Sequence, residues 1–189
     1  IHSGSPTVTN CTFVNNTSTG QGGGAWVGSD SDSTCSGPST ATFINCVFDG
    51  NNSDLGGGIY ATLAAHPTIT GCTFVRNTTG RDGAGLYSNS SNAAVSNCLF
   101  VENDASGQGG AVYNVNSNPT FTGCTFRKNT GLLYAGAMRN LSSNPVLTGC
   151  VFSKNSTPYN GDKADTRIFI RLHKLVTVID PVFTDVLAD

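Results

Sequence analysis

The stretch FTGCTFRKNTG, residues 121–131, decides the fold, because close variants of it return along the chain. ITGCTFVRNTTG stands at 69–80, VSNCLFVENDA at 95–105 and LTGCVFSKNST at 147–157. The cysteines of these stretches follow one another at intervals of 26 residues: Cys72, Cys98, Cys124 and Cys150. A fixed interval over most of a chain indicates a repeat architecture, in which each unit packs on the next.

Three positions of the repeat keep their residue type over six copies. The cysteines are Cys11, Cys46, Cys72, Cys98, Cys124 and Cys150. The phenylalanines, two residues later, are Phe13, Phe48, Phe74, Phe100, Phe126 and Phe152. The asparagines, five residues after the cysteine, are Asn16, Asn51, Asn77, Asn103, Asn129 and Asn155. A side chain three residues before each cysteine is always apolar, which completes the signature of a buried face.

The repeat consists of short segments that are rich in β-branched and aromatic residues and bounded by Gly, Asn, Ser or Pro, which predicts strands and turns. A unit of this size cannot fold alone, so each strand is expected to pair in parallel with its copy in the next unit. We therefore predict an all-β fold: a right-handed single-stranded parallel β-helix of about six coils, each with three short strands.

Within this β-helix the cysteine and phenylalanine columns are expected to face the interior, because side chains two residues apart share a face of a strand. A Gly or Asn precedes each cysteine and predicts a corner there. The asparagines are expected to form a ladder, each amide bonded to the same amide one coil away. The stacked cysteines are interpreted as buried free thiols.

The repeats define a region from residue 1 to 161, and nine extra residues between the first two cysteines form an insert loop at 28–40, which holds Cys35. The pattern ends after Asn155, and residues 162–189 are interpreted as a C-terminal cap or a partial non-repeat segment. The chain opens IHSGSP, without Met or a leader, and we expect it to be a mature or trimmed piece of a longer protein.

Composition excludes two classes of partner. Charged residues make up 12% of the chain and the net charge is −2, whereas nucleic-acid binding needs a basic surface that neutralises phosphates. The sequence has no apolar run of the roughly 18 residues that span a bilayer, so no membrane insertion by this segment is expected. We also expect no cofactor and no metal, because the histidines are scattered and no zinc-type cysteine spacing occurs.

The motif FxxN, which occurs six times, and a tetrad of the type GGA[ILV], which occurs five times and most strictly as GGAV at 109–112, carry a resemblance. Over about residues 5–160 the chain resembles the repeats of chlamydial polymorphic outer membrane proteins and similar bacterial surface β-helix proteins. The resemblance implies an extracellular or cell-surface location and a non-enzymatic, adhesin-like binding role.

A carbohydrate-active enzyme of the pectate-lyase-like β-helix type is the first alternative. It would need carboxylates that act together, and Asp54, Asp82 and Asp104 all fall between the asparagine turn and the glycine-rich segment. The competing interpretation is that these are solvated acids at turns.

Two outward columns offer binding surfaces. Tyr60, Tyr87 and Tyr113, with Arg139 at one end, are expected to form a flat aromatic strip that binds a glycan or a surface protein; the competing interpretation is that they shield the strand or pack under a loop. The pairs Thr7/Thr9, Thr68/Thr70 and Thr120/Thr122 resemble the threonine rows of ice-binding β-solenoids, which gives the second alternative function. Other residues interrupt these rows in the intervening coils: Ile44, Ala94 and Val146.

Overall fold

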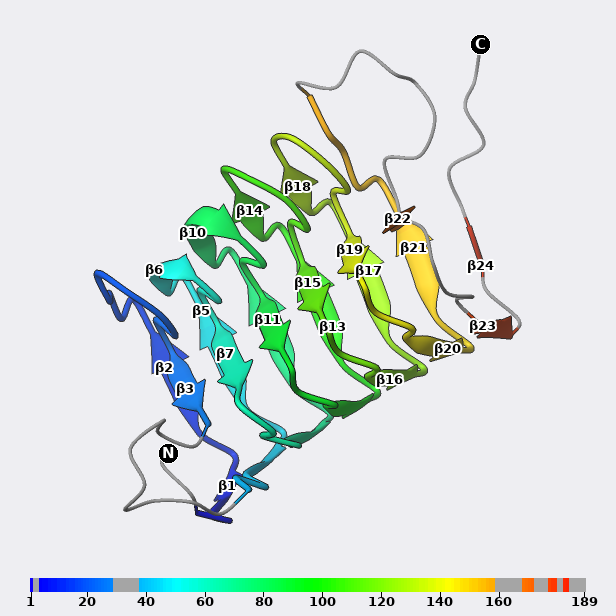
Figure 1. The fold of residues 1–189 in the computed structure, drawn as a ribbon. Coiled ribbons are helices and arrows are strands. Elements are labelled where there is room, and N and C mark those ends of the chain that lie inside the picture. The colour runs from blue at the N-terminus through cyan, green and yellow to red at the C-terminus, as the bar shows by residue number, and fades with distance from the viewer. Residues whose placement is uncertain (2–3, 29–37, 159–167, 172–176, 180–181, 184–189) are drawn as a thin grey trace, which may run out of the picture.

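The computed structural model describes residues 1, 4–28, 38–158, 168–171, 177–179 and 182–183. In this part the chain winds into a rod of stacked coils, with β1 near one end of the rod and β24 near the other (Figure 1). The strands pair in parallel with their counterparts one coil away, for example Phe74 beside Phe100 and Tyr60 beside Tyr87. The predicted all-β parallel β-helix is therefore confirmed.

Four sheets run along the rod, and each coil contributes at most one strand to each. The threonine sheet, before the cysteines, comprises β1 (Thr7–Thr9), β4 (Thr42–Ile44), β8 (Thr68–Thr70), β12 (Ala94–Ser96), β16 (Thr120–Thr122), β20 (Val146–Thr148) and β23 (Thr177–Ile179). The phenylalanine sheet, after the cysteines, comprises β2 (Thr12–Val14), β5 (Val47–Asp49), β9 (Thr73–Val75), β13 (Leu99–Val101), β17 (Thr125–Arg127), β21 (Val151–Ser153) and β24 (Val182–Phe183).

Two further sheets complete the coils. The short sheet, after the asparagines, comprises β6 (Asn52–Leu55), β10 (Thr78–Asp82), β14 (Asp104–Ala105) and β18 (Thr130–Gly131). The tyrosine sheet, after the glycine-rich segments, comprises β3 (Ala25–Val27), β7 (Ile59–Thr62), β11 (Leu86–Asn89), β15 (Val112–Val115), β19 (Met138–Leu141) and β22 (Ile168–Arg171).

The prediction of three strands per coil is wrong, because the segment after each asparagine is also a strand in four of the coils. Its sequences, such as NSDL and TTGRD, have no alternation of apolar and polar residues. The backbone pairs in parallel from coil to coil, with Thr78 between Asn52 and Asp104, and the Asn52 amide also bonds to Oγ1 of Thr78. The buried position of this segment holds small residues of four different types, Ser53, Thr79, Ala105 and Gly131, so no repeated residue type marks the short sheet in the sequence.

The corners are formed by residues with left-handed backbone conformation. The predicted corner before the cysteine is confirmed, with φ values of 51° at Asn45 and 64° at Gly71. A second corner, immediately before each ladder asparagine, has φ values of 52° at Arg76 and 55° at Glu102. Together they turn the chain between the threonine, phenylalanine and short sheets.

The interior of the rod is a continuous stack of phenylalanine rings. Neighbouring rings of the column lie 4.6–4.9 Å apart between centroids and within 9° of parallel. Phe48, Phe74, Phe100, Phe126 and Phe152 are fully buried, whereas Phe13 in the first coil is only partly buried. A Cβ added at Gly85 would lie 2.9 Å from Cδ1 of Phe100, which explains why the glycine-rich segment keeps small residues: it presses against this stack.

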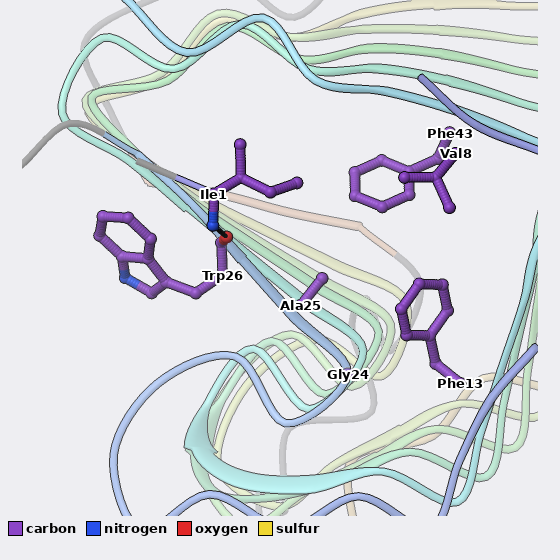
Figure 2. Close-up of a pocket in the computed structure, with 7 residues that line it drawn as sticks. All are labelled: Ile1, Val8, Phe13, Gly24, Ala25, Trp26 and Phe43. Atoms are coloured by element: carbon purple, nitrogen blue, oxygen red, sulfur yellow. Dashed lines mark hydrogen bonds between the residues drawn. The ribbon is translucent and has the colours of Figure 1, made fainter. Parts of the chain in front are cut away.

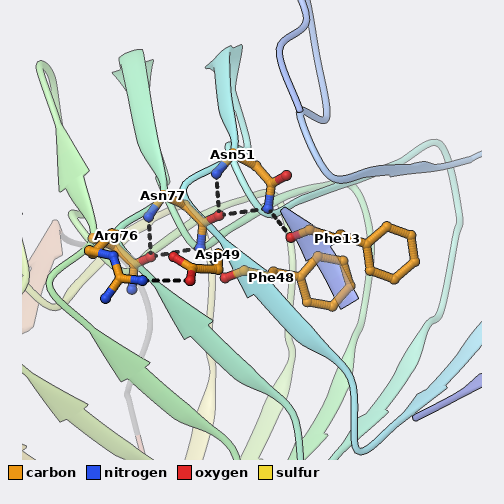
Figure 3. A network of polar contacts seen from close by, with 7 residues as sticks. Phe13, Phe48, Asp49, Asn51, Arg76 and Asn77 are labelled. Carbon is orange, nitrogen blue, oxygen red and sulfur yellow. Dashed lines mark hydrogen bonds and ion pairs between the residues drawn. The ribbon is translucent and has the colours of Figure 1, made fainter. Parts of the chain in front are cut away.

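The predicted asparagine ladder is present in the hydrogen bonds (Figure 3). Nδ2 of Asn51 donates to Oδ1 of Asn77 at 3.0 Å and to the backbone carbonyl of Phe13 at 2.9 Å. The backbone N–H of Asn51 donates to the same Oδ1 of Asn77 at 3.0 Å. Each buried amide thus satisfies backbone groups of its neighbours as well as the next amide, which a bare turn would leave unpaired.

Three strands of the C-terminal segment continue the sheets. By Cα register, Ile168 lies beside Met138, Val178 beside Leu147 and Phe183 beside Phe152. The two longest sheets therefore have seven strands each, so the predicted count of about six coils differs from the structure. The division of the chain at residue 161 stays a prediction. Most of the insert loop, including Cys35, lies outside the described residues.

Candidate binding surfaces

The tyrosine column is stacked but covered. Ring centroids of Tyr60 and Tyr87 lie 5.1 Å apart, and those of Tyr87 and Tyr113 lie 5.0 Å apart. Only 4%, 9% and 5% of these three side chains are exposed. The prediction that they form a flat exposed strip is therefore wrong, and the competing interpretation, packing under a loop, describes them. A ligand-binding role for them and Arg139 stays a prediction.

The cover consists of the residues that precede the glycine-rich segments. These residues follow one another from coil to coil: Gln21, Leu55, Asp82, Gln108 and Tyr134. Four of these five residues contact side chains of the tyrosine sheet. Leu55 packs on the tyrosines, Oε1 of Gln21 accepts from Nε1 of Trp26 at 3.3 Å, and Oε1 of Gln108 accepts from Nε of Arg139 at 2.9 Å. Arg139, only 3% exposed, also has its guanidinium 5.3 Å from the ring centre of Tyr134.

Left-handed glycines allow the cover to fold onto the tyrosines. Gly56 has a φ of 66°, and a Cβ there would lie 2.9 Å from Cβ of Tyr60. Gly83 has a φ of 65°, and its added Cβ would lie 3.1 Å from Cβ of Tyr87. Only glycine combines this conformation with so close an approach at no steric cost. The tyrosines and their cover therefore form a second apolar layer outside the main core.

Burial dominates the electrostatics of this layer. It raises the pKa of the Tyr113 hydroxyl, and burial together with the neighbouring Tyr113 raises the pKa of Tyr87. Burial also raises the pKa of Asp82, although Oδ1 of Asp82 accepts a hydrogen bond from the backbone N–H of Gln108 at 2.8 Å. Burial in the layer thus disfavours the charged forms of Tyr87, Tyr113 and Asp82, whereas the buried charge of Arg139 is held by Gln108 and Tyr134.

The three acids of the enzyme hypothesis share the short sheet but do not form one column. Asp104 pairs with Thr78, and Asp82 pairs with Leu55 at the other end of the strand. Asp54 makes an ion pair of 3.6 Å with Arg81. In the described ranges no group of three or more His, Cys, Asp or Glu side chains is placed to hold a metal ion.

The thiol column is buried in the main core, as predicted, except at its first member. The six cysteines of the column are free, and Cys11 alone of them is exposed. Sγ of Cys98 donates to the backbone carbonyl of Ser96 at 3.2 Å. Burial raises the pKa of the Cys46 thiol, and hydrogen bonding with Cys124 and Cys72, together with burial, raises that of Cys98. Hydrogen bonding with Cys98 lowers the pKa of Cys72, and hydrogen bonding with Cys150 lowers that of Cys124. The five buried thiols therefore differ in pKa but share a packed place in the main core.

An apolar cavity of about 390 Å³ opens at the end of the first coil (Figure 2). Its lining includes Val8, Phe13 and Phe43, which belong to the interior columns, and Ile1, whose amino group donates to the carbonyl of Trp26 at 2.9 Å. The cavity is therefore continuous with the main core at its first coil.

The outer side of the threonine sheet is the one extended face without charge that the described strands provide. The outward positions of β1, β4, β8, β12, β16 and β20 form two ranks, with one residue from each of these six strands in each rank. The first rank holds Thr7, Thr42, Thr68, Ala94, Thr120 and Val146, and the second holds Thr9, Ile44, Thr70, Ser96, Thr122 and Thr148. Each residue that interrupts the threonine pairs thus leaves a hydroxyl beside it: Thr42, Ser96 and Thr148.

A third rank borders this face, and the sequence analysis missed it. It lies two residues before the first rank and holds Ser5, Thr40, His66, Asn92, Asn118 and Asn144. Its members are joined along the rod: Oγ of Ser5 lies 2.6 Å from Oγ1 of Thr40, and Oδ1 of Asn92 accepts from the backbone N–H of Asn118 at 2.6 Å. A count of the position six residues before each cysteine would have found it.

Comparison with known proteins gives a family and no closer relative. No curated protein and no solved structure matches the chain, so the finer resemblance to polymorphic outer membrane proteins stays a hypothesis. Among the described residues no helix has the length and hydropathy to cross a membrane. A family model described as the right-handed β-helix region matches residues 1–144 and 39–180. With the parallel coils and the asparagine ladder, this match shows that the chain belongs to the right-handed β-helix family.

Proposed function

We propose that the chain is a non-enzymatic, adhesin-like binding module that acts outside the cell and contacts an uncharged, extended ligand through the threonine sheet. The proposed extracellular location is supported by the resemblance of the FxxN and GGA[ILV] repeats of the chain to those of bacterial surface proteins. The ligand contact is assigned to the outward face of β1, β4, β8, β12, β16 and β20, which is here called the threonine face.

The distribution of charge carries this proposal. The charged side chains described in the structure lie outside the threonine sheet: Asp49, Asp54, Arg76, Arg81, Asp82, Glu102, Asp104, Arg127, Lys128, Arg139 and Lys154. Several of them form ion pairs between coils, as Asp49 does with Arg76 and Glu102 with Lys128. The threonine face therefore differs from the rest of the rod in having no strongly hydrated group to displace on binding.

The shape of the face supports the same proposal. Its strands lie side by side in a straight row along the lower side of the rod (Figure 1). The β-branched threonines have few accessible rotamers, so little conformational entropy is lost when they contact a ligand. The tyrosine strip, in contrast, would have to lose its cover before it could touch a glycan.

The test compares two variants of one coil. Thr70 and Thr73 are both half-exposed and lie on either side of the same corner, in β8 and β9. Thr70→Lys places a charge on the threonine face, whereas Thr73→Lys places it on the phenylalanine sheet. We expect Thr70→Lys to abolish binding to insoluble neutral polysaccharides or to cells in pull-down assays, and Thr73→Lys to retain it.

The enzyme alternative is tested on the same preparations. Turnover is measured on a panel of acidic polysaccharides, with and without calcium. Turnover that Asp82→Asn or Asp104→Asn abolishes would overturn the proposal in favour of a carbohydrate-active enzyme. Equal binding losses in Thr70→Lys and Thr73→Lys would show that the ligand contact lies elsewhere.

A further inference from the structure

We infer that the ligand of the threonine face is ordered water, that is, the surface of an ice crystal. This inference rests on the proposed function, because it names what the same face binds. Three features carry it: the spacing of the ranks, the chemistry of the side chains, and the way in which neighbouring side chains are held.

The spacing is regular in two directions. Along the rod, the phenylalanine rings measure a rise of 4.6–4.9 Å for each coil, which is the spacing of neighbouring strands. Across the rod, outward residues of one strand are two positions apart, or about 6.6–6.8 Å. The two ranks on the strands therefore form a two-dimensional array with repeats of a few ångströms, which is the scale on which water molecules recur in the planes of ice.

The side chains combine hydroxyl and methyl groups without charge. Thr68, Thr120 and Thr122 are exposed, and each offers a hydroxyl to a water molecule beside a methyl group that cannot bind one. Lysine or a carboxylate would hold its own hydration shell, which does not fit a crystal lattice. A threonine array instead allows water to fill the gaps between methyl groups while it stays hydrogen-bonded to the hydroxyls.

Contacts along the ranks hold several of these groups in place. Oγ1 of Thr70 lies 3.0 Å from Oγ of Ser96 in the next coil. Oδ1 of Asn118 accepts from the backbone N–H of Asn144 at 2.9 Å, and Nδ1 of His66 accepts from that of Asn92 at 3.2 Å. Such groups are already arranged before water orders on them, so less entropy is lost on binding.

A crystalline polysaccharide is the competing ligand, and the face is less suited to it. Sugar rings gain much of their affinity by stacking on aromatic rings, and the described ranks hold none beyond the imidazole of His66. The other described aromatic side chains lie in the main core, in the tyrosine sheet or, like the 39% exposed Tyr134, in its cover. The observations therefore favour ice over a glycan.

The experiment measures thermal hysteresis and ice recrystallisation with the purified chain and two double variants. Thr70→Lys/Thr122→Lys places two charges on the threonine face, and Thr73→Lys/Thr125→Lys places two on the neighbouring phenylalanine sheet as the matched control. We expect the unchanged chain and the control to show hysteresis and to shape ice crystals, and the face variant to lose both. Circular dichroism melts establish that each variant is folded, and Thr120→Lys, at an exposed position, replaces the face pair if that pair melts early.

Three other outcomes would contradict the ice inference alone or both proposals. If the unchanged chain shows no hysteresis and no effect on recrystallisation, the ice inference is wrong. If in that case the face variant still loses binding to insoluble chitin or cellulose, the proposed function stands with a polysaccharide as ligand. If the face and control variants lose hysteresis equally, the threonine face is not the contact surface, and both proposals fall.

Discussion

Asn77 and Asn103 lie one coil apart and are joined by a hydrogen bond of 3.0 Å from Nδ2 of Asn77 to Oδ1 of Asn103. The same oxygen accepts from the backbone N–H of Asn77 at 3.1 Å. Nδ2 of Asn103 in turn donates to the carbonyl of Phe74 at 2.9 Å and to Oδ1 of Asn129 at 2.9 Å. One buried amide thus connects three coils, and the ladder links the corners of the rod along its length.

Removal of one ladder amide should destabilise the rod strongly. Asn103→Ala leaves several buried partners without a hydrogen bond, and each such group costs about 1–3 kcal/mol. We expect the free energy of unfolding to fall by at least about 3 kcal/mol in urea titrations. Asn52→Ala is the control, because its exposed amide bonds only to Oγ1 of Thr78; a loss as small as that of the control would contradict the structural role of the ladder.

The phenylalanine stack should respond to truncation according to position. Phe100→Ala leaves a cavity in the middle of the rod and should cost about 3–5 kcal/mol. Phe13→Ala, in the partly buried first coil, should cost less. Denaturant melts of the two variants check this order, and a loss below about 1 kcal/mol for Phe100→Ala would place the column outside the core.

The covered tyrosines should prove structural. Tyr87→Ala removes a ring between two stacked neighbours and beneath its cover, and we expect a loss of about 3 kcal/mol or more. Thermal and denaturant melts measure it, with Tyr134→Ala, a ring that is 39% exposed, as the milder control. A folded Tyr87→Ala chain of unchanged stability would show that the second layer contributes nothing.

Thiol reactivity should follow burial along the column. Cys11 is exposed and should react first with a maleimide in the native state, whereas Cys98 is 2% exposed and should react only after unfolding. Peptide-resolved mass spectrometry after timed labelling separates the positions. Rapid native labelling of Cys98 would contradict the packed interior.

Asp82 should make stability depend on pH. Burial raises its pKa above the ordinary value of 3.8, with Arg81 and Arg139 opposing the rise and Asp54 adding to it. A group whose pKa is higher in the folded state stabilises the fold below its unfolded pKa, and this stabilisation is lost as pH rises through the folded pKa. Asp82→Asn should therefore raise the melting temperature at pH 7, and the difference should vanish near pH 3. A lower melting temperature at pH 7 would show that its charge is favourable, and Asp104→Asn serves as the exposed control.

The interior of this protein could be predicted from the sequence because its columns repeat one residue type. Phe100 and Asn103 stand where the count of 26 residues places them, and their chemistry is unambiguous in a buried setting. The cover of the tyrosines could not be predicted in the same way, since Leu55, Asp82 and Gln108 occupy one column but share no residue type. Their only common signal is the glycine that follows each of them, and its left-handed conformation folds the cover inward.

The threonine face was predicted in part. The pairs Thr68/Thr70 and Thr120/Thr122 can be read from the sequence, whereas Ile44, Ala94 and Val146 interrupt the threonine rows. The strand register pairs Ser96 with Thr70 and Thr148 with Thr122, so both continue the second rank beside those residues. Alternation within a strand can be read from the sequence, whereas the choice of neighbour across strands depends on the register of whole coils.

The hydrogen bonds between coils run along the axis of the rod, and this has a mechanical consequence. Tension applied between the two ends would pull directly on these bonds and peel one coil at a time, instead of shearing a whole sheet. Each coil released would shorten the rod by about 4.8 Å but free 26 residues, which extend to roughly 90 Å. A chain tethered at one end and loaded at the other would therefore yield in many small steps, and would absorb work over a length far greater than its own.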